Sequence, residues 1–350
     1  MDGTPQEPAV GSASILWILI KRRGSPMRSC LCTMLTIGSV LPATLFSQTP
    51  VIDYHQHLFS PDAAALVTGN QGSPGLGARE VVALLDSAGI RRALVLSMAY
   101  TWGKASRATV DDEYNHVKAE NDWTAQQVSQ YPDRLRAFCS FNPLKSYAIE
   151  ELRRCSGDPQ LRSGLKLHFG NSDVDLANPE NVAQVRDIFR LANFFRMSIV
   201  VHMRTSIDLR RKYGADAARV FLNELLPAAP NVQVQIAHLA GSGGYNATTD
   251  SALSVFTDAI AKRDPRMKNV WFDASTVVRP GMSSDQLQLI AARIRQLGVE
   301  RVLYGSDAAV NPLAYPQAGW KAFQKLPLTE AEFRVIANNV APYMRDVPAR

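Results

Sequence analysis

The histidines of this chain are placed as metal ligands usually are. Five of the six follow short apolar runs that have the composition of β-strands: His55, His57, His168, His202 and His238. Asp307 ends a further run of the same kind. Imidazole nitrogens combined with a carboxylate are typical ligands of zinc, manganese and iron. Any one of these histidines could be an ordinary polar residue at the rim of a fold, so the prediction of a metal site rests on their common position.

The first two histidines are separated by a single residue. Alternate residues of a strand point the same way, so His55 and His57 would project together. A divalent metal held there would lower the pKa of bound water from about 15.7 toward roughly 7 and would polarise a carbonyl oxygen. The sequence contains no GxSxG motif that could supply a serine nucleophile instead. The pattern therefore predicts chemistry assisted by a metal.

The elements that must position these residues alternate along the chain. Runs rich in Val, Ile, Leu and Phe predict strands at residues 51–58, 92–100, 135–143, 164–169, 198–203, 232–239, 269–275 and 301–307. Amphipathic segments predict helices at residues 80–88, 111–130, 179–195, 215–226, 251–262 and 284–297. Eight strand–helix units predict an α/β protein with a (β/α)8 TIM barrel, whose strand ends meet at one face. The alternative is a doubly wound open sheet, but the turn after the first strand lacks GxGxxG.

The first 48 residues differ from the rest. Basic residues precede an uncharged apolar stretch that runs from Cys30 to Phe46, and small residues follow near Ser47, as in a secretory signal peptide. We expect an N-terminal extension and signal peptide over residues 1–48, a barrel domain over residues 49–350, and a periplasmic or secreted protein. Met27 is an alternative start. A single membrane anchor is the alternative to export, but Pro42 and a polar gap interrupt the apolar runs.

Composition excludes several other classes of protein. The chain has 350 residues, of which 46% are hydrophobic, so it can bury a large core. Its net charge of +6 is mild, and without a block of like charges we expect no nucleic-acid partner. We expect no stable membrane span once the leader is removed. Cys139 and Cys155 could pair in an oxidising compartment or remain two buried thiols.

These motifs together resemble the amidohydrolase superfamily. The resemblance covers about residues 51–345 and rests on Asp53-Tyr54-His55-Gln56-His57, on His202, His238 and the Asp307 of YGSD, and on the GLKLHF, HLAG and IANNV segments. It is closest to the amidohydrolase-related branch, which contains aminocarboxymuconate-semialdehyde and resorcylate decarboxylases and the pyrone-dicarboxylate lactonase.

The resemblance implies a role for each matching residue. His55, His57, His202 and Asp307 would hold one divalent metal ion, with zinc favoured and manganese or iron as alternatives. His238 would handle a proton, polarise the substrate or serve as an additional ligand. Asp307 would also be the general base that activates the metal-bound water. A dimer of identical chains is also in keeping with this branch.

The fourth predicted strand carries two further candidates. Lys166 and His168 alternate with apolar residues and should face the barrel interior. In other branches a lysine on this strand is carbamylated and bridges two metals. Because the resembled branch uses one metal, we favour a cationic Lys166 that binds a substrate carboxylate, with His168 as a substrate contact. An interior polar network is the alternative for both residues.

Other candidates concern the substrate, which we expect to be a small anionic molecule. Arg204 lies two residues beyond His202 and could grip a carboxylate. Arg279 is a weaker candidate. Tyr100 and Trp102, at the end of the second predicted strand, could form an apolar wall, although aromatic residues are more often part of the core.

Three functions remain open on this reading. The first is hydrolysis of an amide, lactone or other ester-like carbonyl by a metal-dependent enzyme, which the predicted export favours. The second is non-oxidative decarboxylation of an aromatic or unsaturated carboxylic acid on the same scaffold. The third is a barrel that binds a ligand without catalysis, which would be expected to have lost metal ligands.

Overall fold

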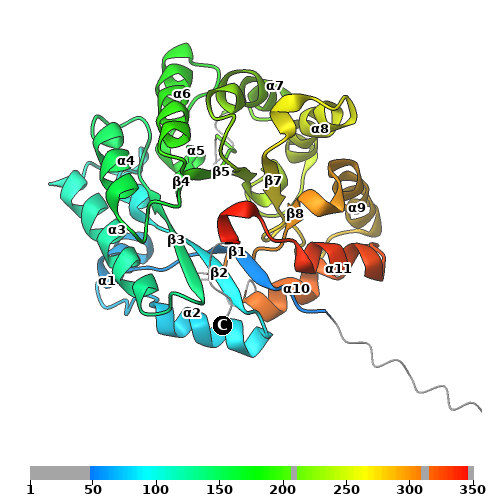
Figure 1. Cartoon of the computed structure of the whole chain (residues 1–350), viewed down its shortest axis with the longest axis horizontal. Coiled ribbons are helices and arrows are strands. Elements are labelled where there is room, and N and C mark those ends of the chain that lie inside the picture. Colours follow the sequence, from blue (N-terminus) through cyan, green and yellow to red (C-terminus); the bar gives the residue numbers. More distant parts are fainter. Residues whose placement is uncertain (1–47, 206–210, 309–314, 346–350) are drawn as a thin grey trace, which may run out of the picture. The chain divides into compact units, whose positions relative to one another are not determined.

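Eight parallel strands form a nearly closed barrel in the computed structural model, which describes residues 48–205, 211–308 and 315–345 (Figure 1). The strands are β1 (Ile52–Gln56), β2 (Arg92–Leu96), β3 (Leu135–Ser140), β4 (Gly164–His168), β5 (Ser198–His202), β6 (Val234–Ile236), β7 (Val270–Asp273) and β8 (Val302–Leu303). Each pairs with its successor in the chain. Backbone hydrogen bonds from Tyr54 N to Tyr304 O (2.9 Å) and from Asp307 N to His55 O (2.8 Å) join the last strand region to β1. The predicted (β/α)8 barrel is confirmed.

Helices surround the strands, as Figure 1 shows. They are α1 (Pro61–Thr68), α2 (Ala78–Ala88), α3 (Glu113–Ser129), α4 (Ala148–Gly157), α5 (Phe169–Ser172), α6 (Pro179–Phe194), α7 (Ala215–Val220), α8 (Ala247–Ala261), α9 (Ser284–Leu297), α10 (Pro316–Phe323) and α11 (Glu330–Asn338). The helix predicted over residues 215–226 is not regular throughout. It passes from α7 into a π-helical turn, Phe221–Leu225, and then a 3-10 turn that contains Pro227. Proline cannot donate the next helical hydrogen bond, so the helix ends there.

Local sequence signals fix where several helices begin. Ser283 and Gln286 form a reciprocal capping box at the start of α9. Thr329 and Glu332 do the same for α11, a helix that the periodicity did not reveal. The side chain of Asn178 caps α6, and Pro179 occupies its first turn, where a missing N–H does no harm. These caps fix where the outer helices start through local contacts that do not involve the barrel interior.

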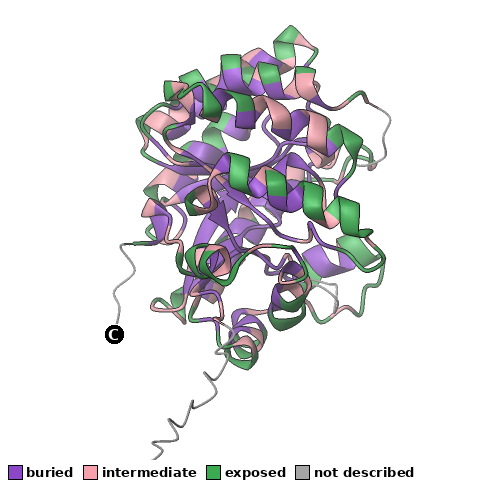
Figure 2. Cartoon of the chain, turned by 90° about the vertical axis from the view of Figure 1, so that its right-hand side faces the viewer, coloured by how far each residue is buried: buried purple, intermediate pink, exposed green. Residues whose placement is uncertain are grey.

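Buried apolar side chains form separate layers inside and outside the strands. Figure 2 shows buried residues along the strands and on the inner faces of the helices. Inside the barrel, Tyr54, Phe138 and Val200 pack with Tyr343 of a C-terminal 3-10 turn, Pro342–Met344. Arg92, at the start of β2, donates a hydrogen bond to the carbonyl of Met344 at 2.9 Å. The C-terminal segment therefore fills the end of the barrel where the strands begin, opposite the end where the histidines lie.

The two cysteines of the barrel domain form a disulfide in the structure. Cys139 of β3 and Cys155 of α4 are both buried, and their Cα atoms are 6.2 Å apart. Of the two possibilities left open by the sequence, the structure has the pairing. The bond ties a strand to the helix that follows it.

The leader predicted over residues 1–48 lies outside the described residues except for Gln48. Within the described parts of the chain, none of the helices is both long and apolar enough to span a membrane.

Candidate active site

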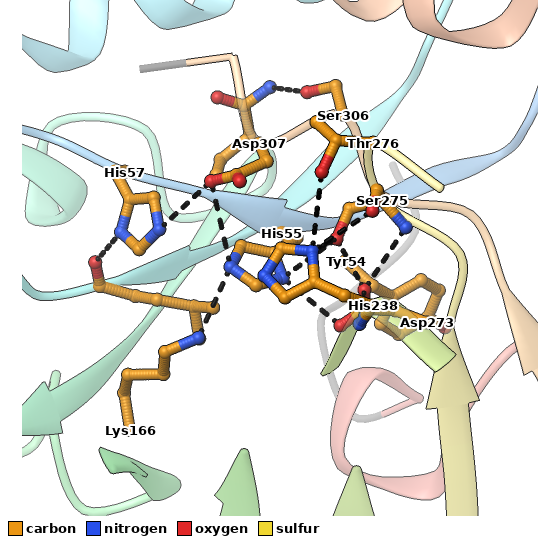
Figure 3. Close-up of polar contacts among 12 residues, drawn as sticks. Tyr54, His55, His57, Lys166, His238, Asp273, Ser275, Thr276, Ser306 and Asp307 are labelled. Atoms are coloured by element: carbon orange, nitrogen blue, oxygen red, sulfur yellow. Dashed lines mark hydrogen bonds and ion pairs between the residues drawn. The ribbon is translucent and has the colours of Figure 1, made fainter. Parts of the chain in front are cut away.

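His55 and His57 lie at the carboxyl end of β1 and face Asp307 (Figure 3). The Nε2 atoms of the two histidines are 3.8 Å and 3.4 Å from Asp307 Oδ1, respectively. The Nδ1 atom of His57 lies 2.7 Å from the carbonyl oxygen of Leu96, which can only accept a hydrogen bond. The proton of neutral His57 is therefore held on Nδ1, and the lone pair of Nε2 is directed toward the carboxylate.

Asp307 is placed by a strained turn and by a buried hydrogen-bond network behind it. Its φ of 56° lies in the left-handed region of backbone conformation, which is unfavourable for residues other than glycine. The preceding Ser306 donates from N and Oγ to Asp53 at 3.0 Å and 2.6 Å, which fixes the turn to β1. Burial would raise the pKa of Asp307, but the imidazoles of His55, His238 and His57 hold that pKa well below its ordinary value. Asp307 is therefore a carboxylate at neutral pH.

His202 lies beside His168 because the strands that carry them pair in register. His168 of β4 is aligned with His202 of β5, and their rings stack at 3.9 Å with an angle of 13° between planes. The Nε2 atom of His202 is buried and has no hydrogen-bond partner among the residues that the structure describes. A buried ring nitrogen without a partner is costly, and coordination of a metal ion is one way to satisfy it.

Lys166 is fully buried in the barrel interior, as its place on β4 predicts. Its Nζ atom lies 3.2 Å from Nε2 of His55. Burial lowers the pKa of Lys166 to about 8, against the opposing charges of Asp273 and Asp307. The amine therefore sits among the same side chains as the predicted ligands.

His238 follows β6 on a backbone that few residue types adopt. His238, Leu239 and Ala240 have φ values of 54°, 48° and 65°, and each such residue costs on the order of 1 kcal/mol. The backbone N–H of His238 donates to Asp273 Oδ1 at 3.0 Å, which helps to hold this turn. The His238 ring centroid lies 4.7 Å from that of His55 and 4.9 Å from that of His202. Strain of this kind clusters at functional sites.

Asp273, at the end of β7, is a residue of this site that the sequence reading missed. Its Oδ2 atom lies 3.1 Å from His55 Nδ1 and accepts from Gln235 Nε2 at 2.6 Å. Its Oδ1 atom accepts from the backbone N–H of His238 and from both N–H and Oγ of Ser275. Burial opposes its ionisation, but the neighbouring His55 imidazole and these hydrogen bonds keep the pKa of Asp273 below its ordinary value. The signal was present: like Asp307, Asp273 is an acidic residue at the end of a predicted strand.

Three groups in the described residues have side chains of the types that bind metal ions. Cys139 with Glu151 and Cys155 contains the disulfide and so offers no free thiol, which leaves two groups: a first, His55 with His57 and Asp307, and a second, His55 with His238 and Asp273. In the second group, Asp273 is already surrounded by hydrogen-bond donors, and His238 Nδ1 lies 3.0 Å from the Ser275 carbonyl oxygen. The first group has its Nε2 atoms directed at a common carboxylate. The first group, extended by the nearby His202, fits a divalent metal better than the second.

The residues predicted to contact the substrate do not all contact the histidine cluster. Tyr100 lies beside the cluster, because its ring centroid is 5.0 Å from that of His168. Arg204 is buried, and its guanidinium lies 5.4 Å from the ring centroid of Tyr213. Trp102 stacks on His116 of α3 at 4.2 Å, away from the other candidates. Arg279 is exposed and approaches the glycines of the loop after β6.

A family model described as amidohydrolase matches residues 52–339, which is most of the chain. The chain belongs to the amidohydrolase family. The match includes β1 through β8 and every residue of the histidine cluster described above. The resemblance seen in the sequence is confirmed. The family is metal-dependent, and the described residues include a possible His/Asp site for a metal ion.

Solved structures share the fold at low sequence identity. A 5-carboxyvanillate decarboxylase from Sphingomonas paucimobilis is 17% identical, with a TM-score of 0.57 over 85% of this chain and 99% of that one. A dihydroxybenzoic acid decarboxylase from a Polaromonas species, with bound manganese and the inhibitor 2-nitroresorcinol, is 15% identical, with a TM-score of 0.56 over 83% and 95%. A probable 2-pyrone-4,6-dicarboxylic acid hydrolase from Acinetobacter baumannii, with citric acid bound, is 16% identical, with a TM-score of 0.52 over 82% and 96%. A search of curated proteins gave no match.

Proposed function

We propose that this chain is a metal-dependent hydrolase that cleaves an amide, lactone or other ester-like bond of a small anionic molecule. The observation that carries the proposal is a pair of histidines, His55 and His57, that face the carboxylate of Asp307. The buried Nε2 of His202, whose ring lies 4.9 Å from that of His238, has no partner among the described residues and supports it. His55, His57, His202 and Asp307 would hold one divalent ion. We favour zinc, although the similar Polaromonas decarboxylase contains manganese.

A divalent ion at such a site polarises a carbonyl oxygen and lowers the pKa of water toward about 7. Asp307 supplies the base, because its carboxylate is ionised and its side chain, 29% exposed, reaches the open end of the barrel. It takes a proton from the attacking water as the hydroxyl oxygen bonds to the carbonyl carbon. The same proton then passes to the oxygen or nitrogen that leaves as its bond to that carbon breaks.

His238 is the second proton-handling group in this proposal. The Ser275 carbonyl oxygen, 3.0 Å from His238 Nδ1, keeps a proton on that nitrogen. The Nε2 atom of the same ring is then free to exchange a proton with the substrate oxygen. The strained backbone at His238 holds the ring between those of His55 and His202.

Lys166, His168, Arg204 and Tyr100 would contact the substrate. A cation held by His55 competes with the Lys166 ammonium for the His55 Nε2 lone pair, 3.2 Å away. Lys166 can then turn its charge to a carboxylate of the substrate. This use of Lys166 needs one metal ion and an unmodified amine rather than a carbamate that bridges two ions.

Metal content and isotope transfer test the proposal. We expect the purified protein to contain about one equivalent of divalent metal and to transfer oxygen from 18O-labelled water into the carboxylate product of a lactone or amide library. A protein that cannot bind zinc or manganese would overturn the proposed metal centre. A carbamylated Lys166, seen as a mass increase and a second metal equivalent, would overturn the single-metal form.

Decarboxylation is the second candidate, because two of the similar structures are decarboxylases of aromatic acids. The same residues serve it: Lys166 holds the carboxylate, and Asp307 takes a proton from water and passes it to the ring carbon as the bond to CO2 breaks, so that CO2 and hydroxide leave as bicarbonate. Release of CO2 from hydroxybenzoates without uptake of 18O into the aromatic product would establish this reaction in place of hydrolysis.

We also propose that the protein is exported. The disulfide between Cys139 and Cys155 supports this proposal, because structural disulfides persist mainly in oxidising compartments. N-terminal sequencing of the mature protein should find a start near Gln48. A cytoplasmic protein with an intact Met1 would contradict it.

A further inference from the structure

The C-terminal turn and the histidine cluster lie at opposite ends of the barrel, yet a line of buried hydrogen bonds joins them. The hydroxyl of Tyr343 donates to Gln235 Oε1, and Gln235 Nε2 donates to Asp273 Oδ2 at 2.6 Å. The same oxygen of Asp273 lies 3.1 Å from His55 Nδ1. Gln235 and Asp273 are fully buried, and Tyr343 is 7% exposed.

Each bond in this line has one permitted direction. Burial raises the pKa of Tyr343 well above its ordinary value, so its hydroxyl keeps its proton and can donate. If the Gln235 amide were flipped, its oxygen would face the Asp273 carboxylate, and two acceptors would meet. The unflipped amide also donates to the Tyr54 carbonyl oxygen at 3.3 Å. The Asp273 carboxylate and the Tyr54 carbonyl therefore orient the amide, and Tyr343 holds it there by donating to the amide oxygen.

The hydrogen bond between Asp273 and His55 determines which ring nitrogen of His55 carries the proton. A carboxylate that accepts from Nδ1 holds the proton there and leaves the Nε2 lone pair available. On the other side of the ring, Lys166 Nζ lies 3.2 Å from Nε2 and can donate to it. Asp273 and Lys166 therefore favour the same tautomer, and the other carboxylate near the ring, Asp307, lies farther away, 3.8 Å from Nε2.

We propose that Tyr343, acting through Gln235 and Asp273, is a positioning residue that holds His55 in the Nδ1-protonated tautomer required of a metal ligand. The inference rests on the proposed function for its metal, but the tautomer can be observed without one. It assigns the C-terminal turn, which is three hydrogen bonds away from His55, a part in setting the affinity of the site for its ion.

Removal of one hydroxyl tests the proposal. In Tyr343→Phe the ring remains to pack against Tyr54 and Phe138, so the fold should persist. We expect the dissociation constant for zinc, measured on the full chain by competition with a chromogenic chelator, to rise about 3- to 10-fold, as for the loss of one buried hydrogen bond. Asp273→Asn should raise it about 10- to 100-fold. The matched control is Tyr304→Phe, which removes a buried hydroxyl bonded 2.6 Å from the Pro316 carbonyl oxygen and should leave the affinity within about 2-fold.

The second measurement uses the metal-free protein. Nitrogen-15 spectra of the histidine rings should show His55 as the Nδ1–H tautomer in the wild type and in Tyr304→Phe, and a mixture of tautomers in Tyr343→Phe. A purely structural Tyr343 would lower the melting temperature and leave the tautomer and the affinity unchanged, which would overturn the inference. If the wild type binds no metal, the proposed function fails, and the spectra still decide whether Tyr343 sets the tautomer.

Discussion

The histidine cluster has two sides that are held in place by different forces. On the hydrogen-bonded side, which consists of His55, His238, Asp273 and Asp307, ring nitrogens and carboxylates contact one another and the backbone. On the stacked side, which consists of Lys166, His168 and His202, two rings lie face to face and Nε2 of His202 has no partner. The first side is fixed by the protein before any ligand arrives. The second has one buried nitrogen, Nε2 of His202, that is without a partner in the described residues and that a metal ion could satisfy.

The largest effect should come from the hydrogen-bonded side. Asp307→Asn keeps the shape of the side chain but removes the base, so we expect kcat/KM to fall by about 10²- to 10⁴-fold. Steady-state kinetics on whichever substrate the screen identifies would measure this fall. A variant with more than a tenth of wild-type activity would mean that another group, such as His238, takes the proton.

Removal of a ring from the stacked side should act on the metal. We expect His202→Ala to weaken zinc binding by more than the roughly 10- to 100-fold typical of a supporting residue, because it removes the unpartnered Nε2. His168→Ala is the matched control, since it removes the other ring of the stack. Equal losses in the two variants, measured by chelator competition, would show that stacking matters more than ligation.

The disulfide supports the strand next to the stacked side. Cys139→Ala with Cys155→Ala opens a loop closed across 16 positions, and we expect the free energy of unfolding to fall by about 3 kcal/mol. Ser140 of β3 is in register with Lys166, so amide hydrogen exchange should rise more in β4 than in β7. An equal rise of amide hydrogen exchange in β4 and β7 would show that the disulfide does not specifically support the stacked side.

The smallest expected effect concerns two buried carboxyl groups, Asp273 and Glu120, whose surroundings differ. Asp273 has five donors and a lowered pKa, whereas Glu120 has only N and Oγ of Ser60, and burial raises its pKa to about 7. Folded protein thus retains a proton on Glu120 that unfolded protein loses near its ordinary pKa of 4.5. This contribution to stability is present at low pH and is lost as pH rises through about 7, by on the order of 2 kcal/mol.

Glu120→Gln removes the titration while keeping the shape of the side chain. Urea unfolding at pH 5 and pH 8 should show a smaller loss of stability for this variant than for the wild type. Identical pH dependence in the two proteins would contradict a raised pKa for Glu120.

Much of the fold followed from patterns of apolar residues. The eight strands begin within two residues of their predicted starts, because a strand buried on both faces needs a continuous apolar run. The short helices α1, α4, α5, α10 and α11 were not recognised, because a helix of ten residues or fewer has few turns in which to show a helical period. For α11 the capping pair Thr329 and Glu332 was a local signal that could have marked its start.

The residues of the site also divide into those that the sequence predicted and one that it did not. His55, His57, His202, His238 and Asp307 were identified because each ends a strand, and parallel strands end at one face. Asp273 was missed because the predicted strand, residues 269–275, ran two residues past it, so it was not counted among the residues that end strands. Its importance arises from five donors that come from β1, from β6 and the turn after it, and from the loop after β7.

The sequence by itself determined the barrel, the end at which the chemistry occurs and the residue types gathered there, since these depend on periodicity and strand order. Only the tertiary structure decided how each side chain is oriented. The proton of His57 is placed by a carbonyl of β2, that of His55 by a carboxylate of β7, and the amide behind it by Tyr343 near the C-terminus. Hydrogen bonds act over about 3 Å between groups distant in sequence, so they exist only once the barrel has closed.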